Sequence, residues 1–465
     1  MAPMLATLAR SPWKAALAAL AFALAALANQ LGPGPGQGPA APAVAAPIVH
    51  VHVKLRAGGA HAWALAHPGA RAEAMFAPLP PGQDDARARW LRVRADDAED
   101  ARRLAAQLAA DPAVEQAFVE PAISLPVLES PGPRAAPPDG ESCPITTPSF
   151  ESYQGYLGPA PHGIDAPAAW RRGYRGAGVW FADIEGGWNA THEDLPGARI
   201  THVGGRPMDE PSWREHGTAV LGEVVGRDNG KGVVGIAPDV ERVLTSSIDG
   251  QSVAAAIDVA ARALRPGDVL LIELQVAGPR GRYIPVEYFD DMFDVIKAAT
   301  DRGVVVIEAA GNGGEDLDHR AYGRKLDRAY RDSGAIMVGA GGPPREGFTD
   351  RARLDFSNYG GRVDVQGWGR KVATLDYGDL QACDGPERER HYTGEFSGTS
   401  SASPIVAGAA VLLQGIARES GAALAPAALR RLLRDTGTPQ TGDTRRAIGP
   451  RPDLEQAIRA LRRYR

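Results

Sequence analysis

The sequence predicts an α/β protein, in which a large domain with a mostly parallel central sheet follows a smaller α+β module. From about residue 160 onward, short apolar runs alternate with helical stretches such as 252–264 and 286–302. Near-continuous apolar runs are typical of parallel strands that helices cover on both faces. The runs that predict strands are 179–184, 240–246, 269–274, 304–310 and 335–340.

The smaller module is predicted over residues 48–125. Residues 48–53 (IVHVHV) alternate between apolar and polar side chains as a strand does, and 90–93 and 114–119 indicate further strands. Residues 96–110 carry acidic side chains in the first turn and apolar ones at helical spacing. Strands with an interleaved helix fit a small α+β module.

The first 28 residues have the pattern of a signal peptide. Arg10 and Lys14 supply positive charge, an apolar run follows, and Ala26-Leu27-Ala28 fits a small-residue cleavage site. The run is shorter than the roughly 20 apolar residues of a membrane-spanning helix. We therefore expect cleavage and no stable membrane insertion, with an uncleaved anchor as the alternative. Either way the body of the chain leaves the cytoplasm, which predicts a secreted or periplasmic protein.

Two proline-rich segments separate the predicted folded parts. Residues 29–47 form a Pro/Gly/Ala linker that has no means of building a core. Residues 126–160 form a Pro-rich connector, and exposed connectors are where proteolytic nicking concentrates. The large domain is therefore expected to span 161–465.

Charge and cysteine content exclude several classes of function. The formal net charge is −5 and the basic residues are scattered, so no nucleic-acid partner is expected. Outside the cytoplasm, Cys143 and Cys383 form one disulfide or remain two buried thiols. The sequence has no CxxC or HExxH pattern, so it predicts no transition-metal site. We expect a monomer.

The strongest chemical signal is FSGTSSASPIVAG at residues 396–408. A nucleophilic serine needs backbone freedom beside it and a helix that starts at it. Gly398 supplies the freedom, and the apolar run after Ser400 supplies a buried helix. The positive end of that helix and the backbone N–H of Ser400 suit a developing oxyanion. Taken alone, the cluster fits a simple loop-to-helix cap equally well.

Two further motifs point to the same chemistry, although each has a plainer interpretation. His216 begins a small-residue helix in EHGTAVLG, where Gly217 leaves room for a substrate backbone. A lone histidine is more often structural than catalytic. Asn312 follows an apolar run in EAAGNGG, and an amide at the carboxyl end of a strand can donate to an oxyanion. An ordinary Asn-Gly turn is the alternative.

In this order, the three motifs resemble those of the subtilisin-like (S8) peptidase family. The family patterns HGTHVAG, AAGN and GTSMASPHVAG correspond to HGTAVLG, AAGN and GTSSASPIVAG in this chain. Two more family segments match GVVGIAP at 232–238 and FSNYG at 356–360. The order acid, His, Ser is the subtilisin order. The resemblance covers about residues 160–460 and implies a secreted serine endopeptidase with a subtilisin-like three-layer fold.

The resemblance also implies residue roles. Ser400 is the nucleophile that forms an acyl-enzyme with a protein or peptide substrate, His216 the general base and Asn312 an oxyanion donor. Residues 48–125 resemble the inhibitory propeptides of the family, and the connector after them is a natural site of self-cleavage. Two alternatives stay open: a catalytically impaired binding module with the same fold, and a membrane-tethered processing protease.

The acid of the triad departs from the family pattern, in which a strand ends in D-[ST]-G. Counting forward from Gly178 and counting back from His192 both place the acid at Glu185. Choosing Asp183 requires a deletion before it and a compensating insertion after it. The two acids are two apart on a strand, so they share a face, and a buried pair shares a proton or has raised pKa values. Glu185 is the expected acid, and Asp183 is its rival or a structural acid.

The walls of the first specificity pocket depart from the family as well. The family has S-L-G where this chain has Glu273-Leu274-Gln275, and Glu308 replaces an alanine on the opposite wall. One hypothesis is that Glu273 and Glu308 favour Arg or Lys in the substrate. The alternative is that both acids pair within the protein and never meet substrate.

A calcium site is the remaining expectation from the resemblance. The family often binds calcium through the acid of H-x-D-L and a loop before GV-x-G. Asp194 and Asn229 occupy the matching positions, and Gln154 is a third candidate ligand. Oxygen ligands of this kind suit calcium. A plain turn cap is the alternative role for Asp194.

Overall fold

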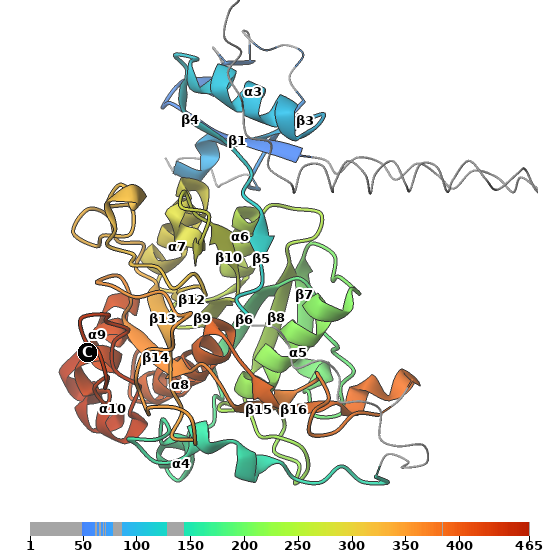
Figure 1. The fold of residues 1–465 in the computed structure, drawn as a ribbon, viewed down its shortest axis with the longest axis vertical. Helices are drawn as coiled ribbons and strands as arrows, with labels where there is room; N and C mark the ends of the chain where they lie inside the picture. Colours follow the sequence, from blue (N-terminus) through green and yellow to red (C-terminus); the bar gives the residue numbers. More distant parts are fainter. Residues whose placement is uncertain are drawn as a thin grey trace, which may run out of the picture. The chain divides into compact units, whose positions relative to one another are not determined.

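A seven-stranded parallel sheet forms the centre of the larger domain (Figure 1). Its strand order is β14-β13-β12-β9-β6-β8-β7, and each neighbouring pair is parallel. The strands are β6 (Trp180–Glu185), β7 (Ile200–Gly204), β8 (Arg242–Ser247), β9 (Val269–Ile272), β12 (Val305–Ala309), β13 (Ile336–Gly341) and β14 (Val365–Trp368). The predicted α/β class is confirmed, and each predicted apolar run overlaps one of these strands. The edge strands β7 and β14 gave no signal because ITHVG and VQGW are short and partly polar.

The computed structural model describes residues 49–464 apart from 61–62, 65–66, 68, 70, 78–85, 128–143 and 384. The predicted signal peptide, the linker after it and Cys143 lie outside these residues. Cys383 is disulfide-bonded. Residues Ile48–Arg465 form one compact unit, so the boundary between the small module and the large domain stays a prediction.

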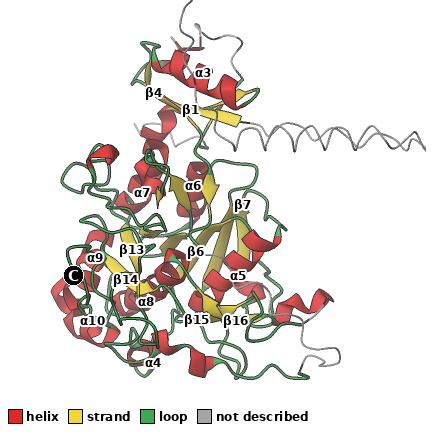
Figure 2. Ribbon diagram, viewed as in Figure 1, coloured by secondary structure: helices red, strands yellow, loops and turns green. Residues whose placement is uncertain are grey.

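Helices cover both faces of the sheet and complete a three-layer arrangement (Figure 2). On one face lie α5 (Pro211–Val225) and α8 (Thr399–Glu419), and on the other lie α6 (Val253–Ala263) and α7 (Asp290–Asp301). Because strand side chains alternate, Val305 and Ile307 of β12 join the core beneath α8, whereas Val306 joins the core beneath α6 and α7. Helix α8 is long and apolar enough to cross a membrane, but it is wholly buried in the fold and is a core helix.

Smaller elements complete the large domain. An antiparallel pair, β15 (Val372–Leu375) and β16 (Tyr392–Phe396), leads into α8. The short helices α4 (Ala166–Trp170), α9 (Pro426–Thr436) and α10 (Leu454–Ala460) pack together.

The small module is a four-stranded antiparallel sheet with one helix. The strand order is β2-β3-β1-β4, and the elements are β1 (Val49–Leu55), β2 (Ala72–Ala74), β3 (Trp90–Ala95), α3 (Ala98–Ala109) and β4 (Val114–Val119). Asp97 caps α3 by accepting from the backbone N–H groups of Glu99 and Asp100. The predicted α+β character of this segment follows from these elements.

A short strand connects the module to the large domain. Strand β5 (Ile123–Ser124) pairs antiparallel with β10 (Gln275–Ala277), which also pairs with β11 (Tyr283–Pro285). Strands β6 and β12 both end at the carboxyl edge of the parallel sheet, where α/β proteins commonly place their sites. The segment after β5 therefore enters the region where Glu185 and Asn312 lie.

Candidate active site

Ser400 occupies the first turn of α8, and the turn that leads to it requires glycine. Gly398 is the N-cap residue and has φ of 103°, in the region that favours glycine. A Cβ at this position would lie 2.1 Å from the carbonyl oxygen of Pro126 and 3.0 Å from Asn312 Nδ2. Ser400 is completely buried, and its Oγ has no hydrogen-bond partner among the described residues.

His216 lies on α5 and contacts the acid at the end of β6. Its Nδ1 is 2.5 Å from Glu185 Oε1, and both side chains are completely buried. Helix α5 approaches the β6 loop so closely that a Cβ on Gly217 would lie 2.3 Å from the Gly187 carbonyl oxygen. The Gly-rich surroundings of the histidine thus bring the imidazole against the end of the strand.

Asp183, the rival acid, has a different partner. Its Oδ2 accepts a hydrogen bond from Trp188 Nε1 at 2.8 Å, and its Oδ1 has no partner among the described residues. The hydrogen bond to His216 comes from Glu185, the residue that both counts of the sequence favoured. The structure therefore brings Glu185, and not Asp183, to the imidazole.

Four carboxylic acids are completely buried and close enough to influence one another: Asp183, Glu185, Glu223 and Glu273. Burial raises the pKa of each well above its usual range, and the neighbouring Glu185 raises the pKa of Asp183 further. Glu273 accepts a hydrogen bond from Ser403 Oγ at 2.5 Å, whereas neither oxygen of Glu223 has a partner among the described residues.

The contact with Glu185 fixes which nitrogen of the imidazole carries the proton. Burial lowers the pKa of His216, so the ring is neutral, and an Nδ1–H directed at Glu185 leaves Nε2 without a proton. Neither His216 Nε2 nor Ser400 Oγ has a hydrogen-bond partner among the described residues. Catalytic hydrogen bonds are often open before substrate reacts and close during the reaction.

Asn312 is held so that its amide N–H points at a carbonyl oxygen. Its Oδ1 accepts from the backbone N–H of Thr399 at 2.9 Å and from Thr399 Oγ1 at 3.0 Å. These donors fix the orientation of the amide, because the oxygen must face them. Asn312 Nδ2 then donates to the Pro126 carbonyl oxygen at 2.5 Å, and the backbone N–H of Ser400 donates to the same oxygen at 3.3 Å. Two N–H donors therefore converge on one carbonyl beside Ser400, as oxyanion donors do.

The hypothesis that Glu273 and Glu308 face a basic substrate residue is wrong. Glu273 is completely buried and accepts a hydrogen bond from Ser403 on α8. Glu308 accepts from the backbone N–H of Glu287 at 3.0 Å and is completely buried beside Arg362. Because side chains alternate along β12, Glu308 lies on the α7 face, opposite to Ile307 and the α8 core.

The candidate calcium ligands do not fit a cation as they are arranged here. Asp194 accepts from Asn229 Nδ2 and from the backbone N–H of Val233, each at 2.8 Å. The Gln154 side-chain oxygen accepts from the backbone N–H of Val234 at 2.9 Å. These oxygens are satisfied by N–H donors, which a calcium ion would have to displace. The alternative role of Asp194, as a turn cap, agrees with these contacts.

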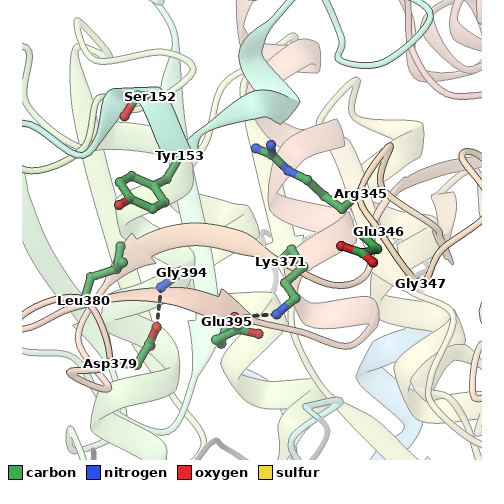
Figure 3. Close-up of a pocket in the computed structure, with 10 residues that line it drawn as sticks. All are labelled: Ser152, Tyr153, Arg345, Glu346, Gly347, Lys371, Asp379, Leu380, Gly394 and Glu395. Carbon is green, nitrogen blue, oxygen red and sulfur yellow. Dashed lines mark hydrogen bonds and ion pairs between the residues drawn. The ribbon is translucent and has the colours of Figure 1, made fainter.

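A cavity of about 690 Å³ lies elsewhere on the domain (Figure 3). It is lined by polar and charged side chains that include the Lys371–Glu395 ion pair, whose atoms are 2.6 Å apart. None of the candidate catalytic residues lines it. The cavity therefore belongs to a different part of the surface.

Sequence reasoning missed the residues that hold the site together. Trp188 had no pattern of its own, and Thr399 lies in the serine motif, which gives no sign of its contact with Asn312 in a separate motif. Gln275 was noticed only as a departure from S-L-G, yet its Oε1 accepts from the backbone N–H of Asn312 at 2.8 Å. That departure was the one signal that could have found it.

A three-layer parallel α/β domain that presents an acid, a histidine and a serine at the carboxyl edge of its sheet falls in the class of serine hydrolases. Residues 187–450, more than half of the chain, match the family model of the subtilases, and the chain belongs to the subtilase family. It is a serine-type endopeptidase and acts on protein substrates. The match begins after Asp183 and Glu185, so it does not cover the unusual acid.

Curated relatives include intracellular proteases and subtilisins. The chain is 27% identical over 267 residues to the major intracellular serine protease of Bacillus subtilis (strain 168), which covers 55% of this chain and 75% of the relative. It is 30% identical over 258 residues to subtilisin BL of Lederbergia lenta, which covers 54% of this chain and 81% of the relative.

Solved structures share the fold. Fervidolysin from Fervidobacterium pennivorans, a keratinolytic enzyme related to subtilisin, superposes with a TM-score of 0.58 at 18% identity. That match covers 90% of this chain and 62% of fervidolysin, so this chain spans less than two thirds of that protein. A protease from Pseudoalteromonas arctica superposes with a TM-score of 0.51 at 20% identity, covering 68% of this chain and 99% of the neighbour.

Proposed function

We propose that this endopeptidase works outside the cytoplasm through an acyl-enzyme on Ser400, with His216 as general base and Glu185 as the acid that orients it. Asn312 and the backbone N–H of Ser400 stabilise the oxyanion. The observation that carries the proposal is the Pro126 carbonyl oxygen, which accepts from both of these donors beside the serine.

The proposed reaction has two halves. Ser400 Oγ attacks the substrate carbonyl carbon as His216 Nε2 takes its proton, and the negative oxygen is held by the two N–H donors. His216 then gives the proton to the leaving amine, and the C–N bond breaks. Water attacks the ester through the same base, releasing the acid and restoring Ser400.

Labelling with a fluorophosphonate tests the proposal. We expect about one adduct per folded chain, on Ser400 by peptide mass mapping, because only an activated serine reacts quickly with this reagent. The chain unfolded in denaturant is the control and should not react. A folded chain that has been freed of residues 48–125 and still stays unlabelled would contradict the proposal and favour a binding module with the subtilase fold.

We also propose that residues 48–125 act as the chain's own inhibitory propeptide. Once this segment has been removed, the mature enzyme is a monomer. The module contacts α6 and α7 through charged pairs: Lys54 Nζ on β1 lies 2.7 Å from Asp294, and Arg87, in the 3-10 helix before β3, lies 2.5 Å from Asp258. His52 Nδ1 lies 2.8 Å from Asp291 Oδ2, and both side chains are completely buried. Calcium has no part in the proposal, since its candidate ligands are satisfied by N–H donors.

The export of the chain rests on the signal-peptide pattern at residues 1–28. The curated relatives include both intracellular proteases and subtilisins, so they leave the compartment open. Sequencing the N-terminus of the protein recovered from the producing cell separates a cleaved signal from a retained anchor. A mature form that still begins within residues 1–28 would favour the membrane-tethered alternative.

Docking of the propeptide should weaken at alkaline pH. Burial opposes the charge on His52, but hydrogen bonds to Asp291 on α7 and contact with Glu120 after β4 raise its pKa from 6.5 to about 9. A group whose pKa is raised on docking contributes stability below its ordinary pKa and loses it as the pH rises through the raised value. We therefore expect the binding constant of the propeptide for the enzyme to be about ten-fold lower at pH 10 than at pH 7.

Size-exclusion chromatography of the processed enzyme at both pH values measures how much propeptide stays bound. The control variant is His52→Gln, whose side chain keeps hydrogen-bonding groups near Asp291 but does not titrate. It should show a clearly flatter pH dependence. Equal retention at pH 7 and pH 10 in the unmodified chain would contradict the assigned role of His52.

A further inference from the structure

Glu273 is a buried acid that the proposed reaction does not use. It follows β9 directly, is completely buried, and stands where the family pattern has serine. Its Oε1 lies 2.5 Å from the Oγ of Ser403 in α8, whereas its Oε2 has no hydrogen-bond partner among the described residues. Because it is costly to bury such an acid, its contacts should show what it contributes.

Ser403 has two oxygen neighbours but only one proton to give. Its Oγ lies 2.5 Å from Glu273 Oε1 and 2.6 Å from the Thr399 carbonyl oxygen, and both distances lie within the range of an O–H···O hydrogen bond. An ionised Glu273 can only accept this proton, and the contact with Thr399 is then left without a hydrogen. A protonated Glu273 donates to Ser403 Oγ, and Ser403 donates to Thr399. Only the protonated acid makes both contacts hydrogen bonds.

The charged groups around Glu273 favour the same form. Burial raises the pKa of its carboxyl group well above the usual range, and Glu185, Asp183 and Glu223 raise this pKa further, whereas the contact with Ser403 lowers it. Glu185 and Asp183 belong to β6 and Glu223 belongs to α5, so these three charged neighbours are all acids. Glu185 is the one in contact with the imidazole. A single negative charge in this cluster is therefore best placed on Glu185, which leaves Glu273 neutral.

The contact with Thr399 connects Glu273 to the oxyanion donor. Thr399 donates to Asn312 Oδ1 from its backbone N–H and from its Oγ1, and thereby orients the amide. Gln275, two residues after Glu273, accepts from the backbone N–H of Asn312 at 2.8 Å. The segment after β9 therefore holds Asn312 from two sides, directly through Gln275 and indirectly through Thr399.

The beginning of α8 depends on such side-chain contacts because a proline interrupts its backbone hydrogen bonds. Pro404 lies inside the helix and has no N–H, so the carbonyl group of Ser400, four residues earlier, lacks its helical donor. Ser403 adjoins this gap, and its Oγ is in contact with the carbonyl oxygen of Thr399. A link from β9 through Ser403 to Thr399 therefore helps to fix the turn that presents the nucleophile.

We propose that Glu273 is a positioning residue that acts in its protonated form. Its carboxyl group donates to Ser403 Oγ, Ser403 donates to the Thr399 carbonyl oxygen, and this link keeps the Asn312 amide and the first turn of α8 aligned for oxyanion stabilisation. The proposal rests on the proposed function. An ionised Glu273 would take the Ser403 proton for itself and would place a second negative charge near Glu185.

Infrared spectroscopy tests the protonation state without relying on activity. A protonated carboxyl group absorbs at a higher frequency than a carboxylate, so the two forms give separate bands. The spectrum of the Ser400→Ala chain at neutral pH is compared with that of the same chain carrying Glu273→Gln as well. We expect the second chain to lose a band of a protonated carboxyl group. Loss of a carboxylate band instead would overturn the inference.

Steady-state kinetics test the positioning role, with each rate expressed per serine that a fluorophosphonate labels, so that unfolded protein does not count. Glu273→Gln keeps the shape of the neutral acid and an N–H donor for Ser403, so its kcat should stay close to that of the unmodified enzyme. Glu273→Leu keeps only the size, and we expect kcat to fall by about ten-fold with little change in KM, the scale of one lost hydrogen bond.

Two kinetic results would overturn the inference. If Glu273→Gln loses as much kcat as Glu273→Leu, the charge of the acid is what matters and the protonated form is not the active one. If neither variant loses kcat, Glu273 does not position the site. In both cases the labelled serine leaves the proposed function standing, whereas failure of the labelling itself would remove the proposed function.

A double-mutant cycle with Ser403→Ala separates the link from a general loss of packing. If Glu273 acts through Ser403, then Glu273→Leu should lower kcat little further in a chain that already carries Ser403→Ala, and fully additive losses would contradict the link. Glu223→Leu is the matched control, because Glu223 is also completely buried but has no hydrogen-bond partner among the described residues. It should leave kcat per labelled serine unchanged, and a loss equal to that of Glu273→Leu would overturn the specific role of Glu273.

Discussion

Replacing Glu185 by Gln is expected to lower kcat by about 10⁴-fold while the protein stays folded. The glutamine amide has nearly the size of the carboxylate, but it carries no charge to stabilise the imidazolium that forms during the reaction. It also presents either a donor or an acceptor to Nδ1, so it no longer fixes the tautomer that keeps Nε2 free. The fall should appear in kcat for a peptide substrate, and in the rate of fluorophosphonate labelling.

Asp183→Asn is the matched control for this substitution. Asp183 has a raised pKa because it is buried beside Glu185, so it is expected to be protonated when Glu185 is charged. An asparagine resembles that neutral form, and its oxygen can still accept from Trp188 Nε1. We expect kcat to change by no more than about ten-fold. A large loss in Asp183→Asn with a small loss in Glu185→Gln would reverse the assignment of the acid.

The second large effect is expected for Asn312→Ala. Removing one oxyanion donor typically lowers kcat by about 10²–10³-fold, because the lost hydrogen bond is strongest when negative charge develops on the oxygen. The remaining donor, the Ser400 N–H, accounts for the activity that stays. KM should change little, since the ground-state carbonyl gains less from the donor than the oxyanion does.

Thr399→Ala serves as the control for Asn312. It removes the hydrogen bond from Oγ1 to Asn312 Oδ1 but keeps the backbone N–H, which donates to the same oxygen at 2.9 Å. Its loss in kcat should be clearly smaller than that of Asn312→Ala. Steady-state kinetics on one peptide substrate compares both variants, and equal losses would mean that Asn312 acts through the position of α8 and not as a donor.

The parallel sheet and three of the site residues could be predicted because their signals are local. Each buried strand is a continuous apolar run, and Ser400, His216 and Asn312 stand in short motifs whose glycines and helix starts are visible in the sequence. Glu185 required counting from two flanking anchors. The structure agrees with this count. It places Gly187 where a Cβ would lie 2.2 Å from the Met208 carbonyl oxygen, so the position requires glycine.

The contacts that could not be predicted join segments that are far apart in the chain. Gln275 meets Leu125 and Asn312 only because β5 enters the site and pairs with β10. Glu308 was expected at the wall of the specificity pocket, but it lies on the α7 face of the sheet. The expectation did not assign the two faces to which side chains of β12 alternate. The calcium ligands were matched by residue type, although the backbone N–H groups of Val233 and Val234 that donate to Asp194 and Gln154 cannot be read from the sequence.

The central claim is that Glu185 is the acid that holds His216. Proton NMR of the Ser400→Ala chain, which does not cleave itself, measures this contact through the His216 Nδ1 proton. A short hydrogen bond to a carboxylate moves such a proton far downfield. The account predicts a far-downfield signal that persists when Asp183→Asn is added and disappears when Glu185→Gln is added. A signal that is lost with Asp183→Asn and kept with Glu185→Gln would contradict it.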